Sequence, residues 1–351
     1  MKKKKKALLW VLTGILVILL LFCGVYHRSI ALSLDNLTAE HFPDPITDPW
    51  EGGRTVRNIP YSSVSESDYL NLYLPEGVDN PPLLVLIHGG GFIAGTAETR
   101  QTQLMYCYFR DQGYAVASVN YRLAQEAPFP AALEDCKAAI RFLRAHAGDY
   151  GYDAERICLF GESAGGYLAT MCAFTNDAEF NSLPFLGQTE ESDPSARVDV
   201  LVDYYPFVAL TGLDADLKEI GCSRLFFDLA NSWLKGNTDG YEDFASCWLR
   251  QNISQMTPEE RQIADPFRYL EKNGAELQGL SVWLIHGESD ITVPIPSSDR
   301  LYAAMQAQLD PGRLVYRVVP HQGHAGDPLY ADSILAEIRD WMSAQLLSPL
   351  P

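Results

Sequence analysis

The sequence predicts an α/β fold with a mostly parallel central sheet and helices on both of its faces. Two observations predict it. Short apolar runs bounded by Pro or Gly recur along the chain, and amphipathic stretches separate them. Such runs are typical of strands that are buried on both faces of a parallel sheet. The alternation of strands with helices favours a sheet wound with right-handed crossovers.

The strands are expected in a regular order along the chain. Residues 69–74 alternate apolar and polar side chains with a period of two, which suits a strand covered on one face. Apolar or alternating runs predict six later strands, at 83–87, 115–119, 156–160, 200–202, 281–285 and 314–319.

Helices are expected between these strands. Residues 131–147 carry Leu133, Ile140 and Leu143 on one side and charges elsewhere, which predicts an amphipathic helix. A second helical run covers 166–174. Residues 206–265 break the rhythm of strands and helices, so we expect an insertion there that covers one edge of the sheet.

Length and charge limit the class of protein. The 351 residues allow one large domain or two ordinary ones, and 47% hydrophobic with 21% charged residues is typical of globular proteins. A net charge of −18 argues against a nucleic-acid binder, which needs a basic surface for the phosphate backbone. The charge is uneven. Residues 1–28 hold six basic and no acidic residues, so the remainder carries 21 basic against 45 acidic residues, or −24.

Residues 1–28 are predicted to be a transmembrane signal anchor. The basic run 2–6 precedes twenty residues without a formal charge, 7–26, which are rich in Leu, Ile and Val. Twenty helical residues span about 30 Å, the thickness of the hydrocarbon core of a bilayer. The positive-inside rule keeps the lysines in the cytoplasm. We therefore expect a single-pass protein of the cell membrane, with the residues from about 27 onward outside the cytoplasm.

Two other N-terminal signals are the alternatives. Residues 29–31 are a weak cleavage site, use of which would release a secreted protein. Cys23 raises the possibility of a lipoprotein, although Phe22 stands where a small residue is expected. After the anchor, 29–54 contain several Pro and Gly residues and are predicted as a tether, which leads to one domain at 55–348.

The chain has seven cysteines, one of them in the predicted anchor. Cys158 lies in an apolar run and Cys172 follows a helical pattern, so both are expected to be buried as small apolar side chains. Cys222 and Cys247 lie in a loop-rich stretch and are the candidate pair for a disulfide.

A serine nucleophile is indicated by the motif G-x-S-x-G at Gly161-Glu-Ser-Ala-Gly165. The pattern alone is weak evidence, and a plain glycine-rich turn is the alternative. The context strengthens it, because the strand 156–160 precedes the motif and the helical run 166–174 follows. Ser163 would then lie on a sharp strand-to-helix turn, and the glycines allow the close backbone approach that such a turn needs.

A second glycine motif, His88-Gly-Gly-Gly-Phe92, follows the strand 83–87. Three consecutive glycines leave backbone N–H groups accessible, and such donors stabilise an oxyanion. A phosphate-binding loop is the rival interpretation, but the pattern G-x-x-x-x-G-K-[ST] is absent. A flexible turn without a function is the other alternative. We expect His88 to support the loop by hydrogen bonds rather than to transfer a proton.

A serine nucleophile needs a base, and seven histidines limit the choice. His321 and His324 follow the run 314–319, and a loop after the last predicted strand can carry a histidine towards Ser163. We favour His324, because Gly323 before it suits a turn that presents the next side chain. His321 is expected to be an ordinary surface residue.

The base needs a carboxylate to orient it, and three are candidates. Asp290 lies in the loop after the strand 281–285, at the same edge of the sheet as the candidate nucleophile, and ranks first. Glu288 lies two residues nearer the strand. Asp327 is close in sequence to the candidate base.

Together the motifs resemble the α/β-hydrolase superfamily. Within it, they resemble the hormone-sensitive-lipase-like and bacterial feruloyl and acetyl-xylan esterase-like (BD-FAE-like) group. They are spread over residues 55–345 in this order: His88-Gly-Gly-Gly-Phe92, Val119-Asn-Tyr-Arg122 with Ala127-Pro-Phe-Pro130, Gly161-Glu-Ser-Ala-Gly-Gly166, His286-Gly-Glu-Ser-Asp290 and His321-Gln-Gly-His324. Serine, aspartate and histidine also follow one another in the chain order that this fold imposes on its triad.

The resemblance implies an α/β-hydrolase fold with a central sheet of about eight strands. It implies that Ser163 is the nucleophile and that Asp290 and His324 complete the triad. It also implies oxyanion donors on the backbone of three residues, Gly90, Gly91 and Ala164.

The expected function is that of a serine carboxylesterase acting on short-chain acyl esters such as acetylated or feruloylated carbohydrates. No metal or organic cofactor is expected, since the His-x-x-His pattern at 321–324 lies in a glycine-bearing loop rather than on a helix. The expected partners are the ester substrate and the membrane, with no nucleic acid. The acyl and alcohol specificity and the oligomeric state are left open.

The sequence departs from hormone-sensitive-lipase-like enzymes at its N-terminus, where those enzymes carry a helical cap. Here only the tether and residues 55–68 precede the first clear strand, so the cap is expected from 206–265. This favours the compact, polysaccharide-esterase-like branch. A serine peptidase or another acyl transferase on the same fold is one alternative, but such peptidases usually lack the His-Gly-Gly-Gly loop. A non-catalytic binding module is the other, and it would normally have lost a triad residue.

Overall fold

The computed structural model describes residues 27–32, 53–189, 193–208, 210–232 and 238–347. The predicted anchor and tether lie almost wholly outside these ranges, and their boundaries stay predictions. Within the ranges described, the model contains no helix of the length and apolarity that a membrane span requires. Residues 27–32 are helical and packed against the domain, although 29–32 were expected to belong to a tether.

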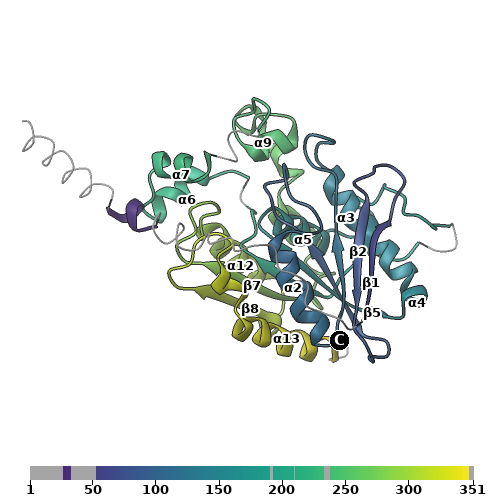
Figure 1. Ribbon diagram of the computed structural model, residues 1–351. Coiled ribbons are helices and arrows are strands. Elements are labelled where there is room, and N and C mark those ends of the chain that lie inside the picture. Colours follow the sequence, from purple (N-terminus) through teal and green to yellow (C-terminus); the bar gives the residue numbers. More distant parts are fainter. Residues whose placement is uncertain (1–26, 33–52, 190–192, 209, 233–237, 348–351) are drawn as a thin grey trace, which may run out of the picture.

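An eight-stranded sheet forms the centre of the fold (Figure 1). Its strands lie side by side in the order β1, β2, β4, β3, β5, β6, β7, β8. Their bounds are Arg54–Pro60 (β1), Tyr69–Leu74 (β2), Pro82–Ile87 (β3), Ala115–Val119 (β4), Asp153–Glu162 (β5), Val200–Tyr204 (β6), Ser281–Gly287 (β7) and Leu314–Val319 (β8). β2 runs antiparallel to β1 and β4, and every other pair is parallel. The predicted fold class and sheet are confirmed.

Helices cover both faces of the sheet, and each face has its own apolar core. On one face lie α3 (Ala131–Ala145), α5 (Ala164–Phe174) and α12 (Pro296–Gln308); on the other lie α2 (Arg100–Asp111) and α13 (Asp332–Leu347). β3 shows the division, because Leu83 and Val85 belong to the first core and Leu84 and Leu86 to the second. Successive side chains of a strand point to opposite faces, so an unbroken apolar run suits a sheet covered on both.

β1 is a strand that the sequence pattern did not predict. Among the described strands it pairs with β2 alone, at the edge of the sheet, and most of its side chains are exposed. Its register with β2 shifts between Val56 and Ile59, where Asn58 has a φ of 53° and its N–H donates to Oδ1 of Asn71 at 2.8 Å. An exposed edge strand buries few side chains, so its sequence does not alternate apolar and polar residues. The strand was therefore not predicted.

The 206–265 insertion consists of short helices that follow β6 at the carboxyl end of the sheet. They are α6 (Leu213–Glu219), α7 (Arg224–Ala230), α9 (Phe244–Leu249), η1 (Ile253–Gln255) and α10 (Pro258–Gln262). Trp248 of α9 is fully buried, with its ring stacked on that of Phe92 at 4.1 Å and packed edge-on against Tyr167 at 5.1 Å. The insertion is thereby joined to the glycine loop and to α5. The remaining elements are α4 (Ala147–Tyr150), α11 (Pro266–Asn273), η2 (Pro311–Arg313) and η3 (Asp327–Tyr330).

The candidate disulfide between Cys222 and Cys247 is not formed, since both are free thiols. The two side chains are buried in different apolar clusters, Cys222 beside α6 and α7 and Cys247 on α9 in the main core. Cys158 and Cys172 are buried among apolar side chains, as expected.

Candidate active site

The candidate nucleophile Ser163 lies on the sharp turn between β5 and α5. Its φ of 54° and ψ of −118° are strained for a residue other than glycine, and they turn its side chain out of the sheet. A Cβ on Gly161 would overlap the carbonyl oxygen of Gly165, and one on Gly165 would overlap that of Ile87. The two glycines are therefore required by close backbone approach. The predicted strand-to-helix turn is present.

The structure brings His324 and Asp290 to this serine. Nε2 of His324 lies 3.0 Å from Oγ of Ser163, and Nδ1 of the same ring lies 2.7 Å from Oδ2 of Asp290. Since a carboxylate only accepts, the proton of the neutral ring is on Nδ1, and Nε2 is left to accept from the serine hydroxyl. The three side chains come from the ends of β5, β7 and β8, which meet at the carboxyl edge of the sheet.

Asp290 is held in a fixed orientation and kept ionised. Its Oδ1 accepts from the backbone N–H groups of Thr292 and Val293, both at 2.9 Å. His286 Nε2 lies 3.3 Å from Oδ2. Burial by itself raises the pKa of Asp290, but the charge of His324, followed by hydrogen bonds from His286 and His324, outweighs burial and holds the pKa well below its ordinary value.

The loop that carries His324 is tied to the end of β7. The N–H of Ser289 donates to the carbonyl of Gln322 at 2.8 Å, and that of Glu288 donates to the carbonyl of Val319 at 3.0 Å. Gly287 packs so closely beneath the loop that a Cβ there would overlap the carbonyl oxygen of Gln322. The histidine and the aspartate are therefore placed by one rigid junction.

The rival candidates of the sequence analysis lie elsewhere. His321 is exposed, and its N–H donates to Oε2 of Glu288 at 3.2 Å. Asp327 accepts two hydrogen bonds from Arg100, each of 3.1 Å. Among the described residues, Glu288 therefore pairs with His321 and Asp327 with Arg100. The carboxylate that is bonded to the imidazole of His324 is that of Asp290.

The glycine loop after β3 lies directly against the nucleophile. A Cβ on Gly89 would stand 3.2 Å from that of Ser163. Gly90 and Gly91 have φ values of 118° and 61°, which favour glycine. Within the described residues, none of the backbone hydrogen bonds outside helices and strands is donated by Gly90, Gly91 or Ala164. The assignment of the N–H groups of Gly90, Gly91 and Ala164 as oxyanion donors stays a prediction.

His88 supports this loop, as expected, and does not reach the serine–histidine pair. Its ring is fully buried, stacks on Tyr121 at 4.2 Å and donates from Nδ1 to the carbonyl of Gly89 at 2.7 Å. The hydroxyl of Tyr121 donates to the carbonyl of His88 at 2.8 Å. Burial lowers the pKa of His88 to about 4, so the ring is neutral near pH 7.

The sequence analysis missed a buried carboxylate next to the nucleophile. Glu162 accepts hydrogen bonds at Oε2 from the hydroxyls of Tyr205 and Tyr330, both at 2.8 Å, and at Oε1 from the N–H of Gly89 at 3.3 Å. Burial raises the pKa of Glu162, and the two tyrosine hydrogen bonds oppose that shift. The available signal was an acidic residue at the second position of G-x-S-x-G. Its partners are far along the chain, since Tyr205 directly follows β6 and Tyr330 ends η3.

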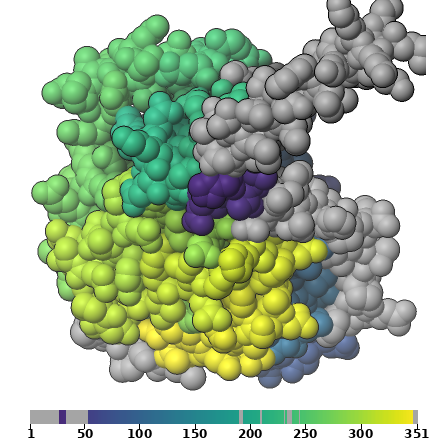
Figure 2. Space-filling view, turned by 90° about the vertical axis from the view of Figure 1, so that its left-hand side faces the viewer, coloured from purple at the N-terminus to yellow at the C-terminus, as the bar shows by residue number. Residues whose placement is uncertain are grey.

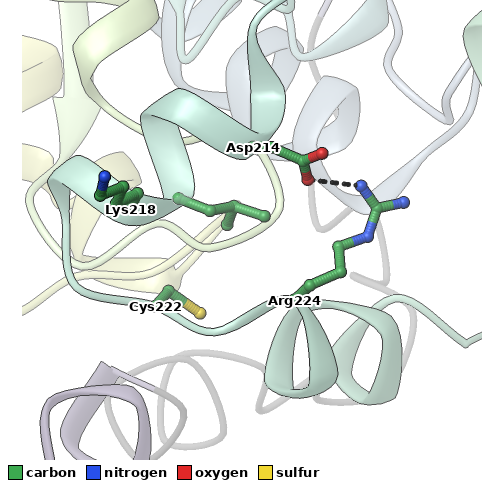
Figure 3. A pocket seen from close by; sticks show the side chains of 5 residues that line it. Asp214, Lys218, Cys222 and Arg224 are labelled. Carbon is green, nitrogen blue, oxygen red and sulfur yellow. Dashed lines mark hydrogen bonds and ion pairs between the residues drawn. The ribbon is translucent and has the colours of Figure 1, made fainter.

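A separate pocket lies between α6 and α7 (Figure 3). It has a volume of about 490 Å³ and is lined by Asp214, Leu217, Lys218, Cys222 and Arg224. An ion pair of 2.9 Å joins Arg224 to Asp214. None of the lining residues belongs to the candidate active site. Among the described residues, no group of three or more His, Cys, Asp and Glu side chains is arranged to hold a metal ion.

The fold and the placement of the serine, histidine and aspartate at the carboxyl edge of the sheet define an α/β fold of the esterase type. The model of the BD-FAE family matches residues 70–305. The chain belongs to the BD-FAE family.

Curated relatives are similar to this chain over parts of their length. Bovine hormone-sensitive lipase (Bos taurus) is 45% identical over 86 residues, which are 24% of this chain and 11% of the lipase. The probable carboxylic ester hydrolase LipM of Mycobacterium tuberculosis is 25% identical over 276 residues, which are 78% of this chain and 56% of LipM. The chain therefore spans less than two thirds of either relative.

A solved structure shares the fold over nearly the whole chain. The truncated form of a carbohydrate esterase from gut microbiota is 22% identical to this chain, with a TM-score of 0.68. The match covers 87% of this chain and 100% of that one. At this identity the likeness shows the common fold.

Proposed function

We propose that this protein is a serine carboxylic ester hydrolase that acts through an acyl-enzyme. The observation that carries the proposal is the hydrogen-bonded series from Asp290 through His324 to Ser163, with distances of 2.7 and 3.0 Å. An imidazole that is oriented by a carboxylate activates a serine hydroxyl as a nucleophile. Membership of the BD-FAE family and the naming of LipM as a probable carboxylic ester hydrolase support it.

In the first step, His324 is the general base. Its Nε2 accepts the proton of the Ser163 hydroxyl as Oγ attacks the carbonyl carbon of the ester. The tetrahedral oxyanion is bound by the N–H groups of Gly90, Gly91 and Ala164, where each donor contributes about 2.7–4 kcal/mol in comparable sites. The imidazolium then protonates the leaving alcohol, and the acyl group stays on the serine.

In the second step, a water molecule takes the place of the alcohol. His324 removes its proton as it attacks the acyl-enzyme, and the acid leaves when the proton returns to Ser163. Asp290 stabilises the imidazolium in both steps. Imidazole supplies all proton transfer and backbone N–H groups supply the electrostatic stabilisation, so the chemistry calls for no metal or organic cofactor.

The proposed substrates are short-chain acyl esters such as acetylated or feruloylated carbohydrates. The support is the similarity in fold to a carbohydrate esterase, together with the family. Trp248 of the 206–265 insertion stacks on Phe92 at the end of the glycine loop, so the insertion lies next to the candidate oxyanion donors.

The proposed location is the cell membrane, with the catalytic domain outside the cytoplasm. The support is the sequence of residues 1–28, with its lysine run and twenty uncharged residues. Secretion after cleavage is the alternative. Carbonate washing of membranes separates the two: an anchored chain stays in the pellet with its N-terminus intact, whereas a cleaved chain is recovered from the medium without residues 1–28.

The test of the proposed activity is a screen of acetyl, butyryl, longer acyl and feruloyl esters, including acetylated polysaccharide. Ser163→Ala should abolish turnover of a short-chain aryl ester while far-UV circular dichroism and melting temperature stay unchanged. His324→Ala should act in the same way, and His321→Ala, three residues away on the same loop, is its matched control and should stay active. Substantial esterase activity in Ser163→Ala would overturn the assignment of the nucleophile.

Two further measurements separate the rival classes. A fluorophosphonate probe labels an activated serine, so absence of labelling in the wild type would favour a non-catalytic binding module. A comparison of matched ester and amide substrates separates an esterase from a serine peptidase. We expect labelling that is lost in Ser163→Ala and turnover of the ester alone.

A further inference from the structure

Two leucines of α7 are strongly exposed. Leu225 and Leu229 have exposed fractions of 61% and 70%, the largest among the big apolar side chains of the described residues. They are four residues apart, so they lie on one face of the helix. Phe227, on the opposite face, is 7% exposed and packs into the cluster with Leu217 and Cys222. Helix α7 therefore has an anchored apolar face and an uncovered one.

The start of the described chain is bonded to this part of the 206–265 insertion. Nε of Arg28 donates to the carbonyl of Ile220, and Oγ of Ser29 donates to that of Gly221, both at 3.2 Å. The N–H of Ser223, which precedes α7, donates to Oγ of Ser29 at 2.9 Å. Figures 1 and 2 show residues 27–32 in purple against the teal α6 and α7.

Apolar packing also stabilises the contact between residues 27–32 and the insertion. Leu32 is 2% exposed and belongs to one cluster with Leu217, Phe227 and Ile291. Residues 27–32 and α7 are thus parts of one packed unit, and residue 27 directly precedes Arg28, which is bonded to this unit. Six helical residues rise only about 9 Å.

The proposed membrane anchor ends next to this unit. The twenty uncharged residues 7–26 end immediately before residue 27. If they span the membrane, as proposed above, residue 27 is at its outer surface, and α7 is held at the same level. Apolar side chains of interfacial helices enter the boundary of headgroups and acyl chains by about 5–10 Å.

The charges of α7 permit this placement. Its charged residues, Arg224 and Asp228, are bonded to each other at 3.0 Å, so the helix itself carries no net charge. The remainder of the domain is strongly acidic and would be repelled by an anionic surface. A zwitterionic phospholipid surface is therefore the matching partner.

We propose that α7 docks on the outer surface of the lipid bilayer, with Leu225 and Leu229 inserted between the headgroups. The inference rests on the proposed membrane location. Docking places the candidate active site close to the membrane, because Ile291, the neighbour of Asp290, belongs to the cluster that holds α7 and Leu32. The domain is then fixed on the membrane rather than free on a tether, and its ester substrates are those of the membrane surface and its vicinity.

The test uses the full chain in phosphatidylcholine nanodiscs. A fluorophore is attached through cysteine at position 225 or 229, in a background in which Cys23→Ala and Cys107→Ser remove the anchor thiol and the partly exposed one. Matched controls carry the label at Val64 or Ile263, which are exposed by 52% and 48% and belong neither to α7 nor to the apolar cluster around it. Brominated phosphatidylcholine then quenches labels that enter the bilayer. Hydrolysis of a water-soluble aryl ester shows that each variant is folded.

We expect quenching at 225 and 229 to exceed that at 64 and 263 at least threefold. Equal quenching at all four positions, in a chain that co-purifies with the nanodisc, would overturn the docking of α7 and leave the anchor and the esterase activity standing. Cross-linking between two copies through position 229, without lipid quenching, would assign the leucine pair to self-association. A chain that does not co-purify with nanodiscs would overturn the membrane location and the docking together.

Discussion

The hydroxyl of Tyr205 donates a 2.8 Å hydrogen bond to Oε2 of Glu162, while the Tyr205 ring lies 4.6 Å from the ring of His324. The residue before the candidate nucleophile is thereby connected, through one aromatic side chain, to the candidate base. Tyr330 donates to the same carboxylate oxygen. Burial raises the pKa of Glu162, whereas the two hydroxyl donors and the charge of His324 lower it in part. A negative charge on Glu162 and a positive charge on His324 therefore stabilise each other.

Glu162→Gln should lower kcat/KM roughly tenfold to hundredfold, because a charge-assisted hydrogen bond contributes about 1.5–3 kcal/mol. Loss of the negative charge also disfavours the imidazolium, so the acidic limb of the pH–rate profile should move to lower pH. Tyr330→Phe keeps the carboxylate and is the milder control. An unchanged profile with a loss of melting temperature alone would assign Glu162 a purely structural role.

Asp290→Asn should reduce kcat by about 10⁴-fold, the effect of the same change on the orienting aspartate of a serine protease triad. An amide can offer its NH₂ to the ring, and the imidazole then takes the wrong tautomer. Glu288→Gln, on the same loop, should retain near-normal turnover. Steady-state kinetics on one aryl ester compares the two variants, and similar losses in both would contradict the assignment.

Gly90→Ala should reduce kcat by about 10²–10³-fold, the measured effect of losing one oxyanion donor. The added Cβ would overlap the carbonyl oxygen of Ala94, and the φ of 118° disfavours any other residue, so the loop must move. Gly148→Ala is the matched control, since nothing lies within 4 Å of a Cβ at that position. Loss of kcat with little change in KM would indicate an effect on the transition state.

The buried, neutral His88 should make the protein less stable in mild acid. Its pKa is lowered from 6.5 to about 4 by burial. As the pH falls below 6.5, the unfolded chain binds a proton that the folded chain does not, so stability decreases until about pH 4. The loss is on the order of 3 kcal/mol over this window.

Urea unfolding at several pH values between 7 and 5 checks this dependence. His88→Asn keeps a donor for the carbonyl of Gly89 but does not titrate, so its unfolding free energy should be lower at pH 7 and vary less with pH. His321→Gln, at an exposed position, should leave the slope unchanged. If the unfolding free energies of the wild type and His88→Asn fall equally with pH, His88 is not the source of the loss of stability in acid.

Much of the fold was predictable, because buried parallel strands and amphipathic helices have distinct periods in the sequence. β3 appears as an unbroken apolar run, since both faces of the sheet are covered. The turn at Ser163 was predictable for a similar reason: only glycine fits at Gly161 and Gly165, so the local geometry is visible in the residue types.

Other features depend on contacts between distant segments. The edge strand β1 is exposed and therefore has no apolar pattern. The prediction of a disulfide between Cys222 and Cys247 was wrong. Position along the chain does not determine in which apolar cluster a cysteine side chain packs, and these two pack in different clusters. Residues 29–32 were predicted to belong to a tether, but Leu32 is buried against the 206–265 insertion.

By itself, the sequence determined the fold class, the sharp turn that presents Ser163 and the identity of His324 and Asp290 as candidates. Each of these depends on local geometry or on the order of strands, both of which residue types reveal. Only the tertiary structure decided that Glu162 meets Tyr205 and Tyr330, and that α7 lies beside residues 27–32. Those contacts join segments more than forty residues apart, and packing of the whole sheet and its insertion brings them together.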